Sequence, residues 1–143
     1  GGKLFVNFIA LTGMAAEITQ WINTSGVSVM AVMALIVVLY IFLGMFLDPI
    51  GIILLTLPLT IPIVEAFGFS LIWFGVVVIK LLEIGLVTPP IGLNVFVIKS
   101  IVGNKISLEA IFGGVAWFLL AEMFVLAAIL GIPALSLYLT MFI

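Results

Sequence analysis

The strongest chemical signal in this sequence is a polar, proline-containing interruption of an apolar run. Residues 85 to 94 read Gly-Leu-Val-Thr-Pro-Pro-Ile-Gly-Leu-Asn. Adjacent Pro89 and Pro90 remove two backbone donors, and Thr88 is pushed out of helical geometry because it precedes a proline. Backbone groups freed inside a membrane persist only when they are buried in protein or face a wet cavity, so we expect a site here. A purely structural kink is the alternative reading, since proline is common in membrane helices.

The interruption offers oxygen ligands for a small cation beside a position that suits an anion. Unwound carbonyls at residues 85 to 88, with the Thr88 hydroxyl, are ligands of the kind that sodium accepts in broken transport helices. The second half of the helix would point its positive end at an anionic substrate. Gly92 permits close backbone approach, and Asn94 offers both a donor and an acceptor. The expected substrate-binding residues are Thr88, Pro90, Gly92 and Asn94, and the expected sodium ligands are Asp48, Gly85 and Thr88, with Pro89 and Pro90 making the break.

A second chemical candidate is Asp48, which follows the apolar stretch 43 to 47 and precedes Pro49. An acidic residue inside a membrane segment is costly and is a functional candidate by default. We therefore expect a carboxylate near the sodium ion at the tip of a helical hairpin. The alternative is that Asp48 only caps the helix that begins at Pro49, a good arrangement for an N-cap followed by proline. One side chain can serve both roles.

The remaining ionisable residues within apolar segments are few. Lys80 and Glu83 are three residues apart and share a helix face. We interpret them as a candidate coupling pair, with a structural ion pair as the alternative. Glu122 lies in the middle of the last helix, and we expect it to pair with a part of the protein outside this chain or with a partner subunit.

Composition places the chain in a membrane. It has 143 residues, of which 66% are hydrophobic and 7% charged, and its mean hydropathy is +1.62. In water-soluble domains, about a quarter of all residues are normally charged. Because the sequence contains no cysteine, histidine or arginine, it lacks thiol chemistry, histidine proton relays and bidentate arginine clamps. A net charge of -2 from ten ionisable residues gives no reason to expect nucleic acid as a partner.

The elements that must position these residues form an all-α polytopic membrane protein with one membrane domain over residues 1–143. Residues 29–67 fit either a re-entrant helical hairpin, which we favour, or two full spans. Glycines at four positions are expected to allow close helix packing. The expected segments are a transmembrane helix at 3–22, the hairpin at 29–67 with its tip near 48–49, a broken helix at 70–103 with its break near 85–91, a transmembrane helix at 107–130 capped by Ser107, and an apolar tail at 131–143; the four glycines are Gly13, Gly44, Gly113 and Gly114.

Three of the lysines test the topology. If the chain starts on the cytoplasmic side, Lys3, Lys99 and Lys105 all fall on that side, as the positive-inside rule expects. The chain begins Gly-Gly-Lys without an initiator methionine. We therefore expect a piece of a longer protein, holding one of the two repeats that a transporter of this kind needs.

The chain resembles the C-terminal portion of the large membrane subunit of tripartite ATP-independent periplasmic (TRAP) transporters. The resemblance covers residues 43 to 103. It rests on Leu43-Gly-Met-Phe-Leu-Asp-Pro49, Pro58 through Pro62, Phe74-Gly-Val-Val-Val78 and, most specifically, Glu83-Ile-Gly-Leu-Val-Thr-Pro-Pro-Ile-Gly-Leu-Asn-Val-Phe96. Lys80 departs from the uncharged polar residue that this pattern leads us to expect.

The resemblance implies one half of an inverted-repeat elevator transporter in the inner membrane of a bacterium or archaeon. It implies sodium-coupled import of an organic acid, such as a C4-dicarboxylate, sialic acid or a similar carboxylate. The implied partners are a small membrane subunit, a periplasmic substrate-binding protein and the N-terminal repeat of the same large subunit. Sodium would be the coupling ion, with no other cofactor. On this pattern Asp48 marks the hairpin tip and residues 88 to 94 the break.

Two other functions remain open from the sequence. One is a sodium-coupled anion transporter of a related family that works without a binding protein. The other is a membrane anchor or assembly subunit that transports nothing. We do not expect an enzyme, because no pairing of a nucleophile with a base is visible among the few carboxylates and hydroxyls.

Overall fold

The structure is a computed structural model that describes residues 2–138, and every regular element in that range is helical. The all-helical part of the fold prediction is thereby confirmed. Of the apolar tail expected at 131–143, residues 139–143 lie outside the described range. The helices are α1 (Gly2–Thr12), α2 (Met14–Ser25), α3 (Val29–Gly44), α4 (Pro49–Ala66), α5 (Leu71–Val87), α6 (Leu93–Val102), the 3₁₀ turn η1 (Gly103–Lys105), α7 (Leu108–Gly131) and α8 (Ala134–Leu137).

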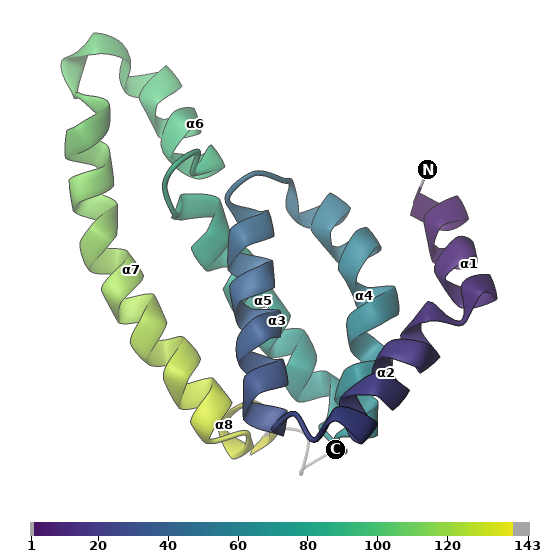
Figure 1. Cartoon of the computed structure of the whole chain (residues 1–143). Helices are drawn as coiled ribbons and strands as arrows, with labels where there is room; N and C mark the ends of the chain where they lie inside the picture. Colours follow the sequence, from purple (N-terminus) through teal and green to yellow (C-terminus); the bar gives the residue numbers. More distant parts are fainter. Residues whose placement is uncertain (1, 139–143) are drawn as a thin grey trace.

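The first apolar segment is two helices rather than one. Gly13 has φ +68°, a left-handed conformation that glycine adopts without strain, and it separates α1 from α2. Both helices pack against α4, on its side away from α5 and α7 (Figure 1). The structure thus differs from the continuous helix expected over residues 3–22. It also differs from the packing role expected for Gly13, because nothing lies within 4 Å of a Cβ placed there.

Helices α3 and α4 form an antiparallel hairpin held together by a buried hydroxyl cluster. Tyr40 of α3 is fully buried. Its hydroxyl oxygen lies 2.6 Å from the Thr56 hydroxyl and 3.3 Å from the Thr60 hydroxyl, both on α4. A buried hydroxyl needs a hydrogen-bond partner, and here each arm supplies partners to the other. The cluster therefore fixes the register between the two arms.

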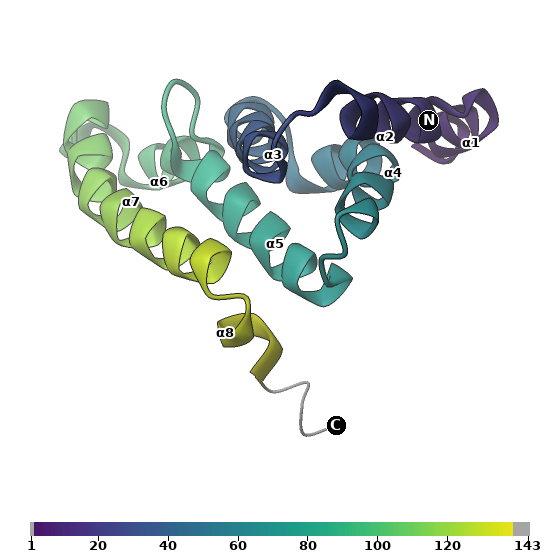
Figure 2. The same ribbon diagram turned by 60° about the horizontal axis from the view of Figure 1, so that its bottom comes forward.

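Helix α5 is the central element of the fold. It packs against α3, α4, α6, α7 and α8, and Figure 2 shows α6 and α7 on the side of α5 opposite α4. Its buried residues include Trp73, Phe74, Val77 and Leu81, so the helix is apolar on most sides, as a core helix should be. The Trp73 indole N–H donates to the Ile129 carbonyl at 2.8 Å. This bond ties the start of α5 to the end of α7.

By length and composition, two helices among the described residues could cross a membrane: α4 and α7. Large apolar side chains of α7 are exposed on the surface, among them Trp117, Phe118 and Phe124. Extended apolar surface of this kind marks contact with lipid or with other protein rather than with water. The fold therefore leaves α7 open to further apolar partners.

Candidate ion and substrate site

The site forms where α5 ends at Val87 and α6 begins at Leu93. In a continuous helix, the N–H groups of residues 89 and 90 would bond to the carbonyls of Gly85 and Leu86. Both residues are proline, so these donors do not exist. The two prolines are joined by a cis peptide bond, and both are exposed. The break is thus a direct consequence of backbone chemistry.

The freed carbonyls are only partly satisfied. The Thr88 N–H donates to the Gly85 carbonyl at 3.1 Å, and the Thr88 hydroxyl donates to the Ile84 carbonyl at 2.6 Å. Within residues 2–138, no backbone N–H donates to the carbonyls of Leu86 or Val87. The end of α5 therefore offers two unpaired carbonyl oxygens, and the Thr88 oxygen keeps lone pairs free beside them.

The tip of the α3–α4 hairpin meets this break through two glycines. A Cβ placed on Gly44, at the end of α3, would lie 2.8 Å from the Gly85 Cα, and one placed on Gly85 would lie 2.7 Å from the Gly44 Cα. Only hydrogen fits at either position, so the two backbones touch directly. The structure thereby brings together the two elements that the sequence analysis proposed separately. For Gly44, the expected packing role is confirmed.

Asp48 lies at the hairpin tip and caps α4. Both of its carboxylate oxygens lie 3.0 Å from the Gly51 N–H, and Pro49 occupies the first helical position. The side chain is exposed. The capping reading is therefore observed, and the exposed carboxylate keeps further lone pairs beyond its bonds to Gly51. Coordination of sodium by Asp48 stays a prediction.

The start of α6 is where the sequence predicts the anion-binding half of the site. Gly92 has φ +58°, and a Cβ there would lie 3.2 Å from Cε1 of Phe112 on α7 and 3.3 Å from the Val87 carbonyl oxygen. A larger residue at position 92 would therefore be strained and crowded. Asn94 is exposed in the first turn of α6, where helix N–H groups lack intrahelical acceptors.

The structure corrects the expectation for Glu122. Its carboxylate lies 2.6 Å from the Lys80 ammonium, which also lies 2.8 Å from Glu83. The pairing is therefore made inside this chain, between α5 and α7. Lys80, unexpected from the family pattern, is explained as the shared cation of two carboxylates. The intramembrane position of Glu122 was the available signal, but its partner is 42 positions away (122 − 80) and could not be read from spacing.

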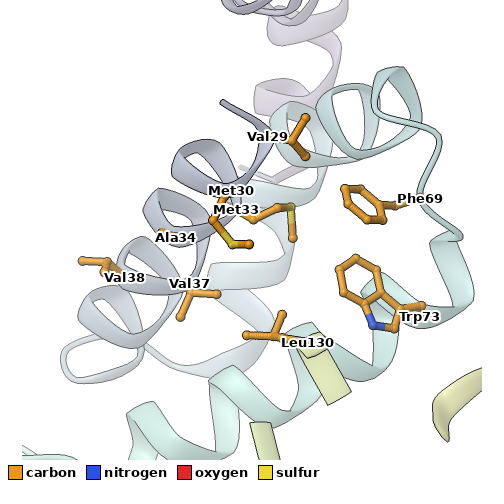
Figure 3. Close-up of a pocket in the computed structure, with 9 residues that line it drawn as sticks. All are labelled: Val29, Met30, Met33, Ala34, Val37, Val38, Phe69, Trp73 and Leu130. Atoms are coloured by element: carbon orange, nitrogen blue, oxygen red, sulfur yellow. The ribbon is translucent and has the colours of Figure 1, made fainter. Parts of the chain in front are cut away.

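The larger of two described cavities, about 610 Å³, lies away from the break. Figure 3 shows its apolar lining from α3, Phe69, Trp73 and Leu130. The only side-chain nitrogen in it, on Trp73, already donates to Ile129. A cavity without free polar groups cannot orient a small anion. We therefore assign neither ion nor substrate to it.

Among the described residues, no group of three or more acidic side chains is placed to hold a metal ion. Any sodium site at the break must therefore rely mainly on backbone carbonyls and the Thr88 hydroxyl. Such ligands suit a monovalent cation, because they carry partial rather than full charges. The sequence pattern does not predict the buried hydroxyl cluster of Tyr40, Thr56 and Thr60. The spacing of Thr56 and Thr60, four residues apart on one helix, is the signal that it offers.

Comparison with known proteins agrees with the sequence resemblance. The family model described as "Tripartite ATP-independent periplasmic transporter, DctM component" matches residues 1–135. The C4-dicarboxylate TRAP transporter large permease protein DctM of Pseudomonas aeruginosa is 30% identical over 134 residues, which cover 94% of this chain and 31% of that protein. The sialic acid TRAP transporter permease protein SiaT of Haemophilus influenzae is 35% identical over 129 residues, covering 90% of this chain and 21% of that protein.

A third relative is the isethionate TRAP transporter permease protein DctMQ of Oleidesulfovibrio alaskensis, which is 30% identical over 103 residues. The match covers 72% of this chain and 16% of that protein. The chain thus spans less than a third of the length of these relatives.

Proposed function

Because the chain belongs to the DctM component family of tripartite ATP-independent periplasmic transporters, we propose that it is the C-terminal repeat of a large permease subunit that couples organic-acid import to sodium. The observation that carries this proposal is the direct contact of hairpin tip and break at Gly44 and Gly85. It supports a site in which the carbonyls of Leu86 and Val87 and the Thr88 hydroxyl act together with the hairpin that Asp48 caps.

Sodium binding at this region follows from the ligands available. The carbonyls of Leu86 and Val87 take the place of Gly85 as the main backbone ligands, because the Gly85 carbonyl already accepts the Thr88 N–H. Thr88 and Asp48 complete the set. Occupation by a cation would neutralise partial negative charge at the end of α5 and at the tip together. Sodium would thus hold hairpin and break in one arrangement.

The substrate class follows from the positive end of α6. The relatives carry the names of C4-dicarboxylate, sialic acid and isethionate transporters, all of which name organic anions. This chain has no arginine, so the anion would be held by N–H groups at the start of α6, with Thr88 and Asn94 beside them and Pro90 and Gly92 shaping the backbone. Each repeat would supply half of this site.

The hairpin is re-entrant on this proposal. Its tip meets α5 near Gly85, while α6 continues beyond the break for 10 residues, about 15 Å. Figure 1 shows α6 and the top of α7 extending past the hairpin tip. With α7 long enough to cross a membrane, the tip would lie inside the hydrocarbon rather than at its far surface.

The complete transporter would lie in the inner membrane as an elevator of two inverted repeats. Its partners would be the N-terminal repeat of the large subunit, a small membrane subunit and a periplasmic substrate-binding protein. The tripartite family, the exposed face of α7 and the length of the relatives support this assembly.

The decisive experiment restores the missing backbone donors. Pro89→Ala and Pro90→Ala, in the full-length protein with its partners in proteoliposomes, return the N–H groups that can bond to the Gly85 and Leu86 carbonyls. We expect a higher sodium concentration for half-maximal uptake and slower uptake. Pro133→Ala, outside the site at the end of α7, is the control.

If assembly is altered but sodium-driven uptake is unchanged, the chain is an anchor subunit and the proposal is wrong. Uptake without a binding protein would favour the related-family alternative.

A further inference from the structure

We propose that Glu83 docks against a lysine or arginine of another membrane helix, in the part of the large subunit that lies outside these 143 residues. The inference rests on the proposed function, because it places the chain within a longer large subunit. It concerns the face of α5 that carries Ile79 and Glu83, one helical turn apart, which we call the Glu83 face.

The first argument is charge. Lys80 lies between two carboxylates, at 2.8 Å from Glu83 and 2.6 Å from Glu122. One positive and two negative charges leave this cluster with a net charge of -1. An uncompensated charge at membrane depth is costly, and such charges pair with one another or face a bundle interior. One more positive charge beside the cluster would compensate it.

The second argument is the difference in burial between the two acids. The Glu122 side chain is 12% exposed, whereas that of Glu83 is 52% exposed. Glu122 is thus enclosed with Lys80 between α5 and α7, while Glu83 keeps an open side. Beside it, Ile79 is 63% exposed. An apolar residue next to a carboxylate suits lysine or arginine. The aliphatic stem of such a side chain packs on the apolar residue, and its charged end meets the carboxylate.

The third argument excludes partners within the described chain. Glu83 is two positions before Gly85, about 200° around the helix, so it faces away from the hairpin and from the proposed ion site. The Lys99 ammonium lies 2.6 Å from each of the Gly103 and Ile106 carbonyls. Within residues 2–138, Lys80 is the one cation paired with Glu83. The relatives contain more than three times the matched length, which supplies the missing helix.

The test is cysteine cross-linking in the full-length protein in membranes. This chain has no cysteine, so Glu83→Cys introduces the only thiol in it. In a cysteine-free background, the Glu83→Cys variant is combined with a second substitution, in which one lysine or arginine of the other membrane helices at a time is replaced by cysteine. We expect a bifunctional thiol-reactive cross-linker to join the thiol at position 83 to one basic position, because a glutamate and its basic partner hold their Cβ atoms further apart than the about 4.5 Å that a disulfide allows. Glu83→Lys should lower the Tm of the purified protein, and exchanging the basic partner for glutamate should restore it.

Glu65→Gln, an exposed acid at the end of α4 that forms no ion pair among the described residues, is the matched control. If Glu83→Cys does not fold, Glu83→Gln replaces it: we expect a Tm about 2–4 °C lower, against no change in the control. A Tm unchanged by Glu83→Gln, no cross-link at any basic position, or a cross-link to the small subunit alone would overturn the inference. Neither the cross-link nor the Tm depends on transport. Both results can therefore be interpreted even if the proposed sodium-coupled import is wrong.

Discussion

Gly44 of α3 and Gly85 of α5 touch backbone to backbone, and this contact joins the hairpin tip to the broken helix. A Cβ on either residue would lie within 2.8 Å of the other residue's Cα. Residues 41 positions apart (85 − 44) thus determine whether the cap at Asp48 and the carbonyls at Leu86 and Val87 share one region. The proposed ion site depends on this approach more than on any single side chain.

Gly85→Ala and Gly44→Ala should each force the hairpin tip away from the break. Overpacking of a close contact costs about 1–3 kcal/mol, and here the obstructing atoms are backbone, which cannot rotate aside. We expect a lower Tm and weaker sodium dependence of uptake in the full-length protein. Gly75→Ala is the control on the same helix, because nothing lies within 4 Å of its Cβ. Equal stability of all three variants would show that the contact is unimportant.

Thr88→Val should weaken sodium binding beyond its effect on stability. The change keeps the side-chain shape but removes the hydroxyl, whose bond to the Ile84 carbonyl is worth about 0.5–1.5 kcal/mol. Thr19→Val removes an equivalent bond to the Ala15 carbonyl at 2.8 Å, far from the break. Sodium titration of binding, by isothermal calorimetry or Tm shift, should separate the two. The same sodium affinity in both variants would exclude Thr88 as a ligand.

Tyr40→Phe should loosen the hairpin. It removes the hydroxyl that links the arms, while Thr56 and Thr60 keep their bonds to the Ile52 and Thr56 carbonyls, so we expect a cost of about 0.5–1.5 kcal/mol. The measurement is a double-mutant cycle of unfolding with Thr56→Val. We expect strong non-additivity, because both changes break the same contact. Additive losses would mean that the two hydroxyls act independently.

Lys80→Met should be more damaging than Glu122→Gln. The first leaves two carboxylates without their common cation, whereas the second leaves the Lys80–Glu83 pair intact. The Lys80 and Glu122 side chains are 21% and 12% exposed, so breaking their pair should cost less than the about 3–5 kcal/mol of a fully buried one, whereas replacing a whole pair by apolar residues is often neutral. We therefore expect Glu122→Leu to restore part of the Tm lost in Lys80→Met. A Tm that falls further in the double variant would contradict this account.

Features that depend only on neighbouring residues can be read directly from the sequence. Pro89 and Pro90 lack backbone donors wherever they stand, so the end of α5 and the unpaired Leu86 carbonyl follow from those positions alone. Ser107, which accepts from the Ala110 N–H at 3.2 Å, and Asp48 are caps for equally local reasons. The family was also evident, because its most specific residues lie in one continuous stretch.

The contacts between residues far apart in the sequence come from the packing of whole helices. Glu122 and Lys80 form an ion pair because α7 runs beside α5, and no spacing rule links them. Gly13 and Gly44 look alike in sequence, yet one breaks a helix and the other receives a neighbouring backbone. The physical reason is that backbone hydrogen bonding is fixed within a few residues, whereas packing and charge pairing depend on how whole helices lie against one another.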